Sequence, residues 1–365
     1  MEDIFVVGYD KHNLTDRQNY NGIDAAKFVC SILVIMLHVP PFGVSDDPAI
    51  LFWNGFIQNY LARIAVPFFF VCSGFFLYKK TSRFLFTFEP TKRYAVRLLK
   101  LYILWTVIYL PLSSRAFAKD TEGLSHAVLA YLQKCIFKGS YVQLWYLPAT
   151  IFSVLLISFL LYRKMAPVVI VAIASLFYLI GLLATSWHGA VEPLKKAAPS
   201  LWALFGDIQK VILTTRDGLF VGFLFVAIGM VFAFYDVGIS KKLSMIGFSV
   251  SMVLMFGELC LLQYLHFARK EEVYVFLVPA VFFGFAFVSQ VRLPDNPVYR
   301  MLRNLSSLIY YTHMLCMREI ARLLHKPLSQ TGWLFVCTLC ATVALSYAVI
   351  RLSELPKLRW LKKLY

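Results

Sequence analysis

Long apolar stretches alternate with short polar segments along most of the chain. A helix needs about 20 apolar residues to cross the hydrocarbon core of a bilayer. Such stretches occur at 25–42, 60–78, 96–113, 142–162, 166–186, 217–235, 243–265, 272–290, 304–324 and 332–350. They are too long for the strands of a membrane barrel and lack the alternation of such strands. The pattern predicts an all-α integral membrane protein with about ten transmembrane helices.

Composition and charge agree with this prediction. Hydrophobic residues make up 59% of the chain and charged residues only 15%, whereas soluble domains carry about 25% charged residues. The net charge of +16 raises nucleic-acid binding as an alternative. However, Lys and Arg occur in short clusters between the apolar stretches, which is typical of membrane topology signals. We therefore expect a lipid bilayer, and no nucleic acid, as the partner of this surface.

The distribution of basic residues predicts the orientation. With the N-terminus inside, most Lys and Arg residues fall on the cytoplasmic side, and the first outer loop holds no basic residue before Arg63. This bias indicates cytoplasmic N- and C-termini. We expect a short cytoplasmic segment at 1–20, a single transmembrane domain at 21–355 and a basic cytoplasmic tail at 356–365. Two long outer segments, about 114–141 and 187–216, are placed to cover an outward-facing site.

The cysteines carry no metal or redox signal. Cys135 lies in a loop, and the other cysteines lie within apolar stretches. Cys337 and Cys340 form a CxxC motif, but no second pair or histidine partner accompanies it. Packing inside helices is the favoured interpretation, so we expect no metal cofactor.

The first predicted helix holds the clearest candidate site. Lys27 and His38 are 11 residues apart, which at 100° per residue brings both to nearly one helix face, about 16 Å apart along the axis. Asp24 lies on nearly the same side. Ionisable residues inside a membrane are costly and indicate function, and histidine suits proton transfer. The structural alternative is an imidazole bonded to a neighbouring backbone carbonyl.

A second basic feature opens the third predicted helix. Arg93, Arg97 and Lys100 recur at helical spacing and form one stripe at its cytoplasmic start. Such a stripe is suited to bind phosphates, for example those of a nucleotide. Ordinary positive-inside anchoring of the helix is the alternative.

Further candidates for a substrate site lie within or near other apolar stretches. Glu258 lies in the middle of one stretch, where a carboxylate needs a partner. It either accepts a hydrogen bond from a substrate or pairs with a base such as Arg216 or Arg318. Arg216 forms either a local ion pair with its acidic neighbour or part of an outward pocket. His313 and Trp145 each have a structural alternative, as a packed imidazole and an interface aromatic.

Several of these residues fall in motifs that resemble the acyltransferase-3 superfamily of membrane-bound acyltransferases. The likeness begins with a basic residue and a histidine in the first helix, here Lys27 and His38. It continues through FFFVCSGFF (68–76), Arg97-Leu98-Leu99-Lys100, QLWYLPA (143–149) and SSLIYYTHMLCM (306–317). In the RxxR-like motif Lys100 replaces the second arginine, which keeps the charge but loses the bidentate fork. The membrane half of vancomycin-resistance serine racemases is similar at LARIAVPFFFVCSGFFL (61–77) and TTRDGLFVGFLFVAIGM (214–230).

The resemblance implies acyl transfer across a bacterial plasma membrane. The donor is expected to be cytoplasmic acyl-CoA, with acetyl-CoA as the default, and the acceptor a hydroxyl of an envelope glycan or similar molecule. His38 is implied as the general base or as a transient acyl carrier. The residues implied to bind the CoA phosphates are Lys27, Arg93, Arg97 and Lys100. Those implied to bind the acceptor are Asp24, Trp145, Arg216, Glu258 and His313.

Two other functions stay open. The racemase likeness motivates a transporter-like membrane module, for example for L-serine, and charges near the midplane of broken helices also suit transport. A non-catalytic assembly partner is the third possibility. Serine racemases append a large PLP-dependent domain, and because this chain ends at Tyr365 without one, we expect no racemisation. The sequence predicts no oligomeric state.

Overall fold

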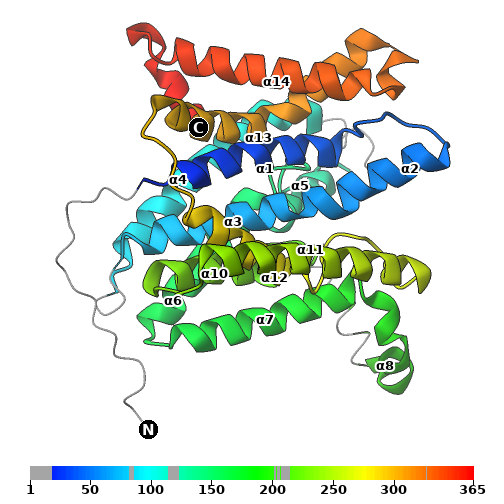
Figure 1. Cartoon of the computed structure of the whole chain (residues 1–365). Coiled ribbons are helices and arrows are strands. Elements are labelled where there is room, and N and C mark those ends of the chain that lie inside the picture. Colours follow the sequence, from blue (N-terminus) through cyan, green and yellow to red (C-terminus); the bar gives the residue numbers. More distant parts are fainter. Residues whose placement is uncertain are drawn as a thin grey trace.

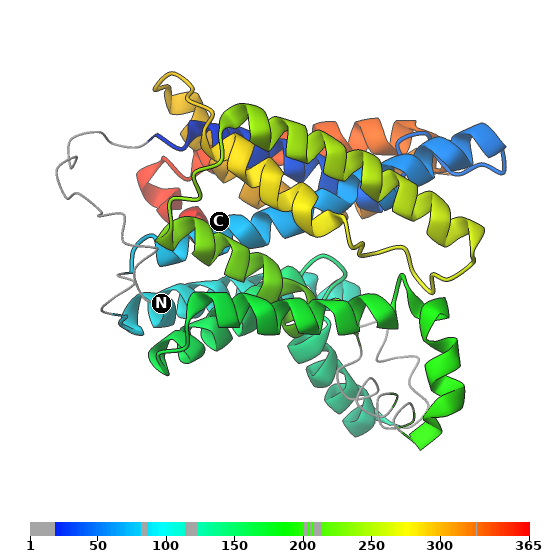
Figure 2. The ribbon, with the colours of Figure 1, turned by 60° about the horizontal axis from the view of Figure 1, so that its bottom comes forward.

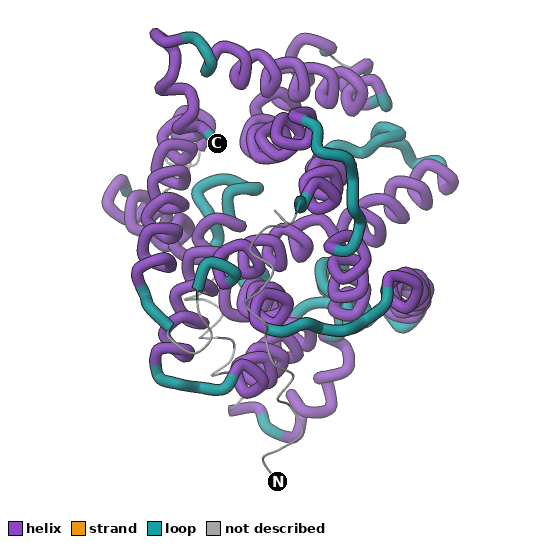
Figure 3. Tube along the Cα trace, turned by 60° about the vertical axis from the view of Figure 1, so that its left-hand side comes forward, coloured by secondary structure: helices purple, strands orange, loops and turns teal. Residues whose placement is uncertain are grey.

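The fold is almost entirely helical in a computed structural model of the chain, which we describe over residues 19–81, 86–113, 123–200, 203, 206, 214–325 and 327–365. Figure 3 shows helices joined by loops, and the described residues hold no strand beyond an isolated bridge between Gly43 and Thr331. The predicted all-α class is therefore confirmed for these residues. Residues 1–18 of the expected N-terminal segment at 1–20, and parts of both long outer segments, lie outside them.

Most of the α-helices coincide with the predicted apolar stretches. They are α1 (Asn21–His38), α2 (Pro48–Gly55), α3 (Ala65–Tyr78), α4 (Glu89–Ser113), α5 (Leu124–Phe137), α6 (Tyr146–Tyr162), α7 (Pro167–Ala184), α8 (Glu192–Ala197), α10 (Phe223–Phe234), α11 (Lys241–Tyr264), α12 (Leu277–Ser289), α13 (Pro297–Leu324) and α14 (Trp333–Leu352). Two π-helical segments are η1 (Phe56–Tyr60) and η5 (Gly218–Gly222). The 3-10 segments are η2 (Leu61–Ile64), η4 (His188–Val191), η6 (Leu328–Gln330) and η7 (Pro356–Leu364). Each predicted stretch overlaps one of these α-helices, whereas α2, α5 and α8 lie outside the stretches.

Six helical segments of the described chain are long and apolar enough to cross a membrane. They are Asn21–His38, Pro48–Tyr78, Glu89–Ser113, Pro167–Ala184, Lys241–Tyr264 and Trp333–Leu352. The segments Tyr146–Tyr162, Gly218–Phe234 and Leu277–Ser289 are apolar but shorter. The 28-residue helix α13 carries several arginines. The structure thus supports a membrane protein, while the count of ten spans stays a prediction.

Most of the long helices lie roughly parallel in one bundle (Figure 1). Helix α1 contacts α13, α3 and α12, so it runs through the middle of the bundle. Figures 1 and 2 show the start of α1 and the C-terminal segment η7 at the same end. This arrangement is the one expected if both lie on one side of a membrane.

Helices α3 and α10 pack backbone against backbone, because glycines lie where they cross. The space that a Cβ on Gly74 would need is filled by the backbone of Val226. A Cβ on Gly229 would lie 2.7 Å from the Phe75 backbone nitrogen and 3.0 Å from the Gly74 Cα. Small residues at such crossings are typical of membrane helix pairs. The pair positions the site, since η2 leads directly into α3 and η5 directly into α10.

Candidate functional site

His38 is the last residue of α1, and the sequence fixes where that helix ends. Pro40 and Pro41 follow, and proline cannot donate the backbone hydrogen bond that would extend a helix. The last carbonyls of a helix then need other donors. The Gln58 side-chain amide donates to the carbonyls of the two residues before His38, at 3.2 and 3.3 Å. The backbone that carries His38 is therefore held by η1.

Helix α13 brings a second histidine against His38. The imidazole rings of His38 and His313 stack with their centroids 5.4 Å apart. His313 is fully buried, and its Nδ1 lies 3.0 Å from the Ile309 carbonyl oxygen. Because a carbonyl can only accept, Nδ1 carries the proton of the neutral ring and Nε2 is left as an acceptor. Among the described residues Nε2 has no hydrogen-bond partner, so the ring keeps one nitrogen available beside His38.

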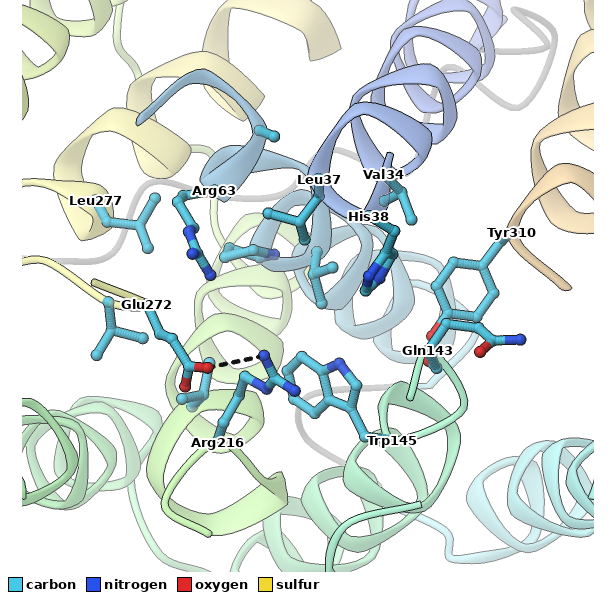
Figure 4. A pocket seen from close by; sticks show the side chains of 15 residues that line it. Val34, Leu37, His38, Arg63, Gln143, Trp145, Arg216, Glu272, Leu277 and Tyr310 are labelled. Atoms are coloured by element: carbon cyan, nitrogen blue, oxygen red, sulfur yellow. Dashed lines mark hydrogen bonds and ion pairs between the residues drawn. The ribbon is translucent and has the colours of Figure 1, made fainter. Parts of the chain in front are cut away.

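His38 lines a cavity that is partly open to solvent. Its lining consists of Val34, Leu37, His38, Ala62, Arg63, Val66, Pro67, Gln143, Trp145, Arg216, Val221, Glu272, Val273, Leu277 and Tyr310. Figure 4 shows the side chains of His38, Arg63 and Arg216 directed toward the same space. Three predicted site residues, His38, Trp145 and Arg216, therefore line one cavity, and a fourth, His313, stacks against His38.

Arg216 is held by Glu272 and Trp145. Its Nη1 donates to Glu272 Oε1 at 3.1 Å, and its guanidinium carbon lies 5.1 Å from the centroid of the Trp145 ring. That distance is typical of a cation–π contact. The alternative pairing of Arg216 with its neighbour Asp217 is not observed. Asp217 Oδ1 instead caps η5, accepting from the backbone N–H groups two and three residues later at 2.8 and 2.9 Å.

Glu258 lies outside the cavity, and donors surround its carboxylate. Oε1 accepts from the Trp187 indole N–H at 2.7 Å and from the Val275 backbone N–H at 2.8 Å. Oε2 accepts from the Phe276 backbone N–H at 3.0 Å. These bonds connect α11 to the segments that follow α7 and precede α12. Structural donors thus satisfy the carboxylate, and the expected pairing with Arg216 or Arg318 is not seen among the described residues, while a substrate contact of Glu258 stays a prediction.

Lys27 and Asp24 lie near the other end of α1, away from the cavity. Asp24 Oδ2 lies 3.8 Å from Arg303 Nη1. Lys27 is half-buried and interacts electrostatically with Asp24, Arg303 and Arg97. Lys27 and Arg303 thus share the carboxylate of Asp24 at this end, and Arg97 is a further cation near Lys27. Asp24 therefore lies with these cations and not in the lining of the His38 cavity, and its expected contact with an acceptor stays a prediction.

The predicted basic stripe lies on the first turns of α4. Arg93, Arg97 and Lys100 are all exposed there. The Nε of Arg93 lies 3.5 Å from Glu89 Oε1, one turn earlier, and an exposed pair of this kind contributes only about 0.3–0.5 kcal/mol to stability. Arg97 is the member of the stripe that interacts with Lys27 among the described residues. The stripe is therefore accessible, and Arg97 connects it with α1.

Arg63, Glu272 and Tyr310 also line the cavity, and the sequence prediction assigns them no role. Arg63 Nη2 donates to Asn59 Oδ1 at 3.0 Å, and an arginine inside the apolar stretch LARIAVP is itself a signal of function. Glu272 carries no such signal, because its partner Arg216 is 56 residues away in the sequence. Tyr310, whose hydroxyl donates to the Gln143 backbone carbonyl, lies in a motif rich in aromatic residues that equally predicts packing.

Comparison with known proteins identifies relatives over most of the chain. Two amino-acid racemases from Enterococcus faecalis are 28% identical over 273 residues (73% of this chain and 35% of the relative) and 32% identical over 227 residues (61% and 30%). A serine/alanine racemase from Enterococcus gallinarum is 27% identical over 299 residues (80% and 40%). The chain thus spans at most two fifths of the length of these relatives. No solved structure matches.

The family comparison covers more of the chain than these relatives do. A family model described as an acyltransferase domain matches residues 20–351. The match includes His38, the lining of its cavity and the basic group around Lys27. Together with the apolar helices, it indicates a membrane acyltransferase in general terms and confirms the resemblance seen in the motifs. This chain belongs to the acyltransferase-3 family.

Proposed function

We propose that the protein transfers an acyl group, acetyl by default, from cytoplasmic acyl-CoA to a hydroxyl of an envelope molecule such as a glycan. The arrangement of α1 supports this proposal. One uninterrupted helix carries His38 on the cavity and Lys27, eleven residues earlier, in a basic group with Arg97 and Arg303. A helix of that length spans about 16 Å. A donor with phosphates at one end and a thioester at the other fits such a separation.

The basic group supplies the donor side of the proposed reaction. Lys27, Arg97 and Arg303 outnumber the carboxylate of Asp24, so at least two positive charges are available for phosphates. Arg97 and Arg303 present guanidinium groups, which bind phosphate oxygens in pairs. Lys100 and Arg93 are exposed on the same helix as Arg97 and extend the positive surface.

His38 supplies the proton transfer. Its imidazole accepts the proton of the acceptor hydroxyl as that oxygen attacks the thioester carbonyl carbon. The carbon–sulfur bond then breaks, and the CoA sulfur leaves as a thiolate that takes the proton from the imidazolium. The products are an ester and free CoA thiol, so protons and electrons balance. His313 stacks against His38 and restricts the orientation of its ring during both transfers.

A transfer assay tests the proposal directly. Detergent-purified protein is incubated with radiolabelled acetyl-CoA and a delipidated envelope fraction, and label in the envelope fraction is counted. Because a general base contributes about 10²–10⁴-fold, His38→Ala should lower the rate at least about 100-fold. The control is His266→Asn in an exposed turn at φ 52°, a conformation that asparagine tolerates. Retained transfer by His38→Ala would remove His38 from the mechanism.

Donor binding is tested separately. The double variant Lys27→Met with Arg97→Gln should bind acetyl-CoA at least about tenfold more weakly, since hydrogen bonds to charged groups contribute about 1.5–3 kcal/mol each. Arg322→Gln is the matched control, because that arginine is exposed and pairs with Glu319 at 2.6 Å. Equal affinity of the double variant and the control would show that the phosphates bind elsewhere.

The proposed reaction requires a multi-pass protein of the plasma membrane with both ends in the cytoplasm. Cysteine labelling of intact cells tests this orientation, in a background whose exposed cysteines are replaced. Asp46→Cys lies in the loop after α1 and should react with a membrane-impermeant thiol reagent. Lys357→Cys lies in η7 and should react only after lysis. The reverse pattern would place Lys27 outside and contradict the use of cytoplasmic acyl-CoA.

The racemase relatives favour one alternative, a transporter-like membrane module for an amino acid such as L-serine. The matched part is 35–40% of the length of two of them. A transporter has no use for a basic group that binds CoA. Uptake of labelled L-serine into proteoliposomes without CoA would favour this alternative. A non-catalytic assembly role predicts neither uptake nor transfer.

A further inference from the structure

The cavity beside His38 holds two guanidinium groups that the proton transfer does not use. Arg63 and Arg216 both line it, and Glu272 is the acidic residue of the lining. The lining therefore carries one net positive charge. Glu271 lies outside the lining, where its carboxylate accepts hydrogen bonds from Asn59 at 2.7 Å and from Gln263 at 3.1 Å.

Arg63 is the less satisfied of the two cations. Its Nη2 donates to Asn59 Oδ1 at 3.0 Å. Its Nε is buried, and among the described residues it has no hydrogen-bond partner. A buried donor without a partner costs about 1–3 kcal/mol, and more for a charged group. A negatively charged ligand would remove this cost.

The surroundings fix both cations before any ligand binds. Asn59, which accepts the hydrogen bond from Arg63, is itself held by two hydrogen bonds. Its backbone carbonyl accepts from the Tyr274 hydroxyl at 2.7 Å, and its side-chain amide donates to Glu271. Arg216 lies on the Trp145 ring with one nitrogen on Glu272. Figure 4 shows both guanidinium groups facing the space below His38. Planar guanidinium groups bind oxyanions through paired hydrogen bonds.

We propose that this cavity binds an acceptor that carries a singly charged oxyanion, a carboxylate or a phosphodiester, near the hydroxyl that reacts at His38. Arg63 and Arg216 bind the oxyanion, and Glu272 neutralises one of the two positive charges of the lining. The role of the hydroxyl in this inference rests on the proposed acyl transfer. The binding of an oxyanion rests on the cavity alone.

Binding is measured first, without any acyl donor. Small probes form two matched pairs: glycerate with its neutral methyl ester, and glycerophosphoglycerol with neutral glycerol. The thermal midpoint of the purified protein is followed against probe concentration, because a ligand that binds the native state raises it. At least one anion should bind about tenfold more tightly than its neutral partner. The probe pair that shows this preference tells whether the cavity binds a carboxylate or a phosphodiester.

Variants assign the preference to residues. Arg63→Gln and Arg216→Gln should each reduce the anion preference about tenfold, and Arg63→Lys should recover part of it, because lysine keeps the charge but loses the fork. Arg322→Gln should leave it unchanged. Equal binding of anions and neutral partners, no midpoint shift with either anion, or a preference that survives both glutamine variants would overturn the proposal. Arg63→Lys keeps the test valid if Arg63→Gln does not fold.

A transfer arm separates this inference from the proposed function. Acetyl transfer from acetyl-CoA to glycerate should exceed transfer to its methyl ester by about the same factor as binding. An anion preference without any acetyl-CoA turnover would retain the oxyanion site and contradict the acyltransferase mechanism. Turnover with equal use of charged and neutral probes would retain the mechanism and overturn the oxyanion site.

Discussion

The contact between α3 and α10 predicts a large effect of one added methyl group. Gly229→Ala would place a Cβ 2.7 Å from the Phe75 nitrogen and 3.0 Å from the Gly74 Cα, with the Val71 carbonyl oxygen closer still. Ordinary contact begins at 3.4 Å, so the helices must move apart by about 0.7 Å or more. These neighbours are backbone atoms of a helix, and no rotamer change can relieve the overlap.

The magnitude follows from two opposing effects. Overpacking of a close contact costs about 1–3 kcal/mol, and a clash with backbone belongs at the upper end of that range. Alanine in place of glycine returns about 1 kcal/mol of helix propensity. We expect a net loss of roughly 2 kcal/mol. Because Arg63 precedes α3 and Arg216 precedes α10, a separation of these helices should also weaken any anion preference of the cavity.

The assay is the thermal midpoint of detergent-purified protein, followed by fluorescence-detected size exclusion. Gly257→Ala is the matched control, since it also lies inside a helix (α11) and a Cβ there would meet no described atom within 4 Å. The control should be unchanged or slightly stabilised, and Gly229→Ala should lose several degrees. Equal midpoints for the two variants would refute a backbone-to-backbone contact between α3 and α10.

Three further substitutions test other parts of the structure. Glu258→Ala leaves three donors without their acceptor, and each buried donor without a partner costs about 1–3 kcal/mol. The thermal midpoint should therefore fall without loss of acetyl-CoA binding. A wild-type midpoint would contradict the structural role of Glu258. Gln58→Ala removes the donor at the end of α1 and should slow transfer by misplacing His38, with donor affinity unchanged; an equal loss of both would argue for global damage. Tyr78→Phe removes a buried hydroxyl 3.0 Å from Ser158 Oγ and should cost about 1 kcal/mol without changing the transfer rate. A slower rate in this variant would assign Tyr78 a part in transfer.

Helix α1 shows why part of the site could be predicted from sequence. The spacing of Lys27 and His38 is a local property of the 3.6-residue repeat, and the structure has both on one helix. The stack of His38 on His313 and the pair of Arg216 with Glu272 are different. They join segments far apart in the sequence, and no local pattern encodes such contacts.

Glu258 shows what a local sequence pattern cannot predict. An ionisable residue in an apolar stretch indicates function by default, but here a folded-back segment supplies backbone donors. The helix lengths also could not be predicted from sequence alone. Apolar length predicts helices at all ten stretches, yet α12 has only 13 residues and α6 only 17. The position of the neighbouring segments determines how long each helix becomes, and sequence alone does not predict that position.

In the proposed reaction, the single helix between Lys27 and His38 sets both the distance and the angle between the phosphates and the thioester of the donor. One residue inserted between them would lengthen the separation by about 1.5 Å and rotate Lys27 by about 100° relative to His38. Four inserted residues would lengthen it by about 6 Å but rotate Lys27 by only about 40°. A flexible donor arm tolerates a longer reach more readily than a phosphate group on the wrong side of the helix. If the proposed transfer is correct, the transfer rate should fall with one inserted residue and recover with four, so donor binding would depend on the angle between the two side chains more than on their distance.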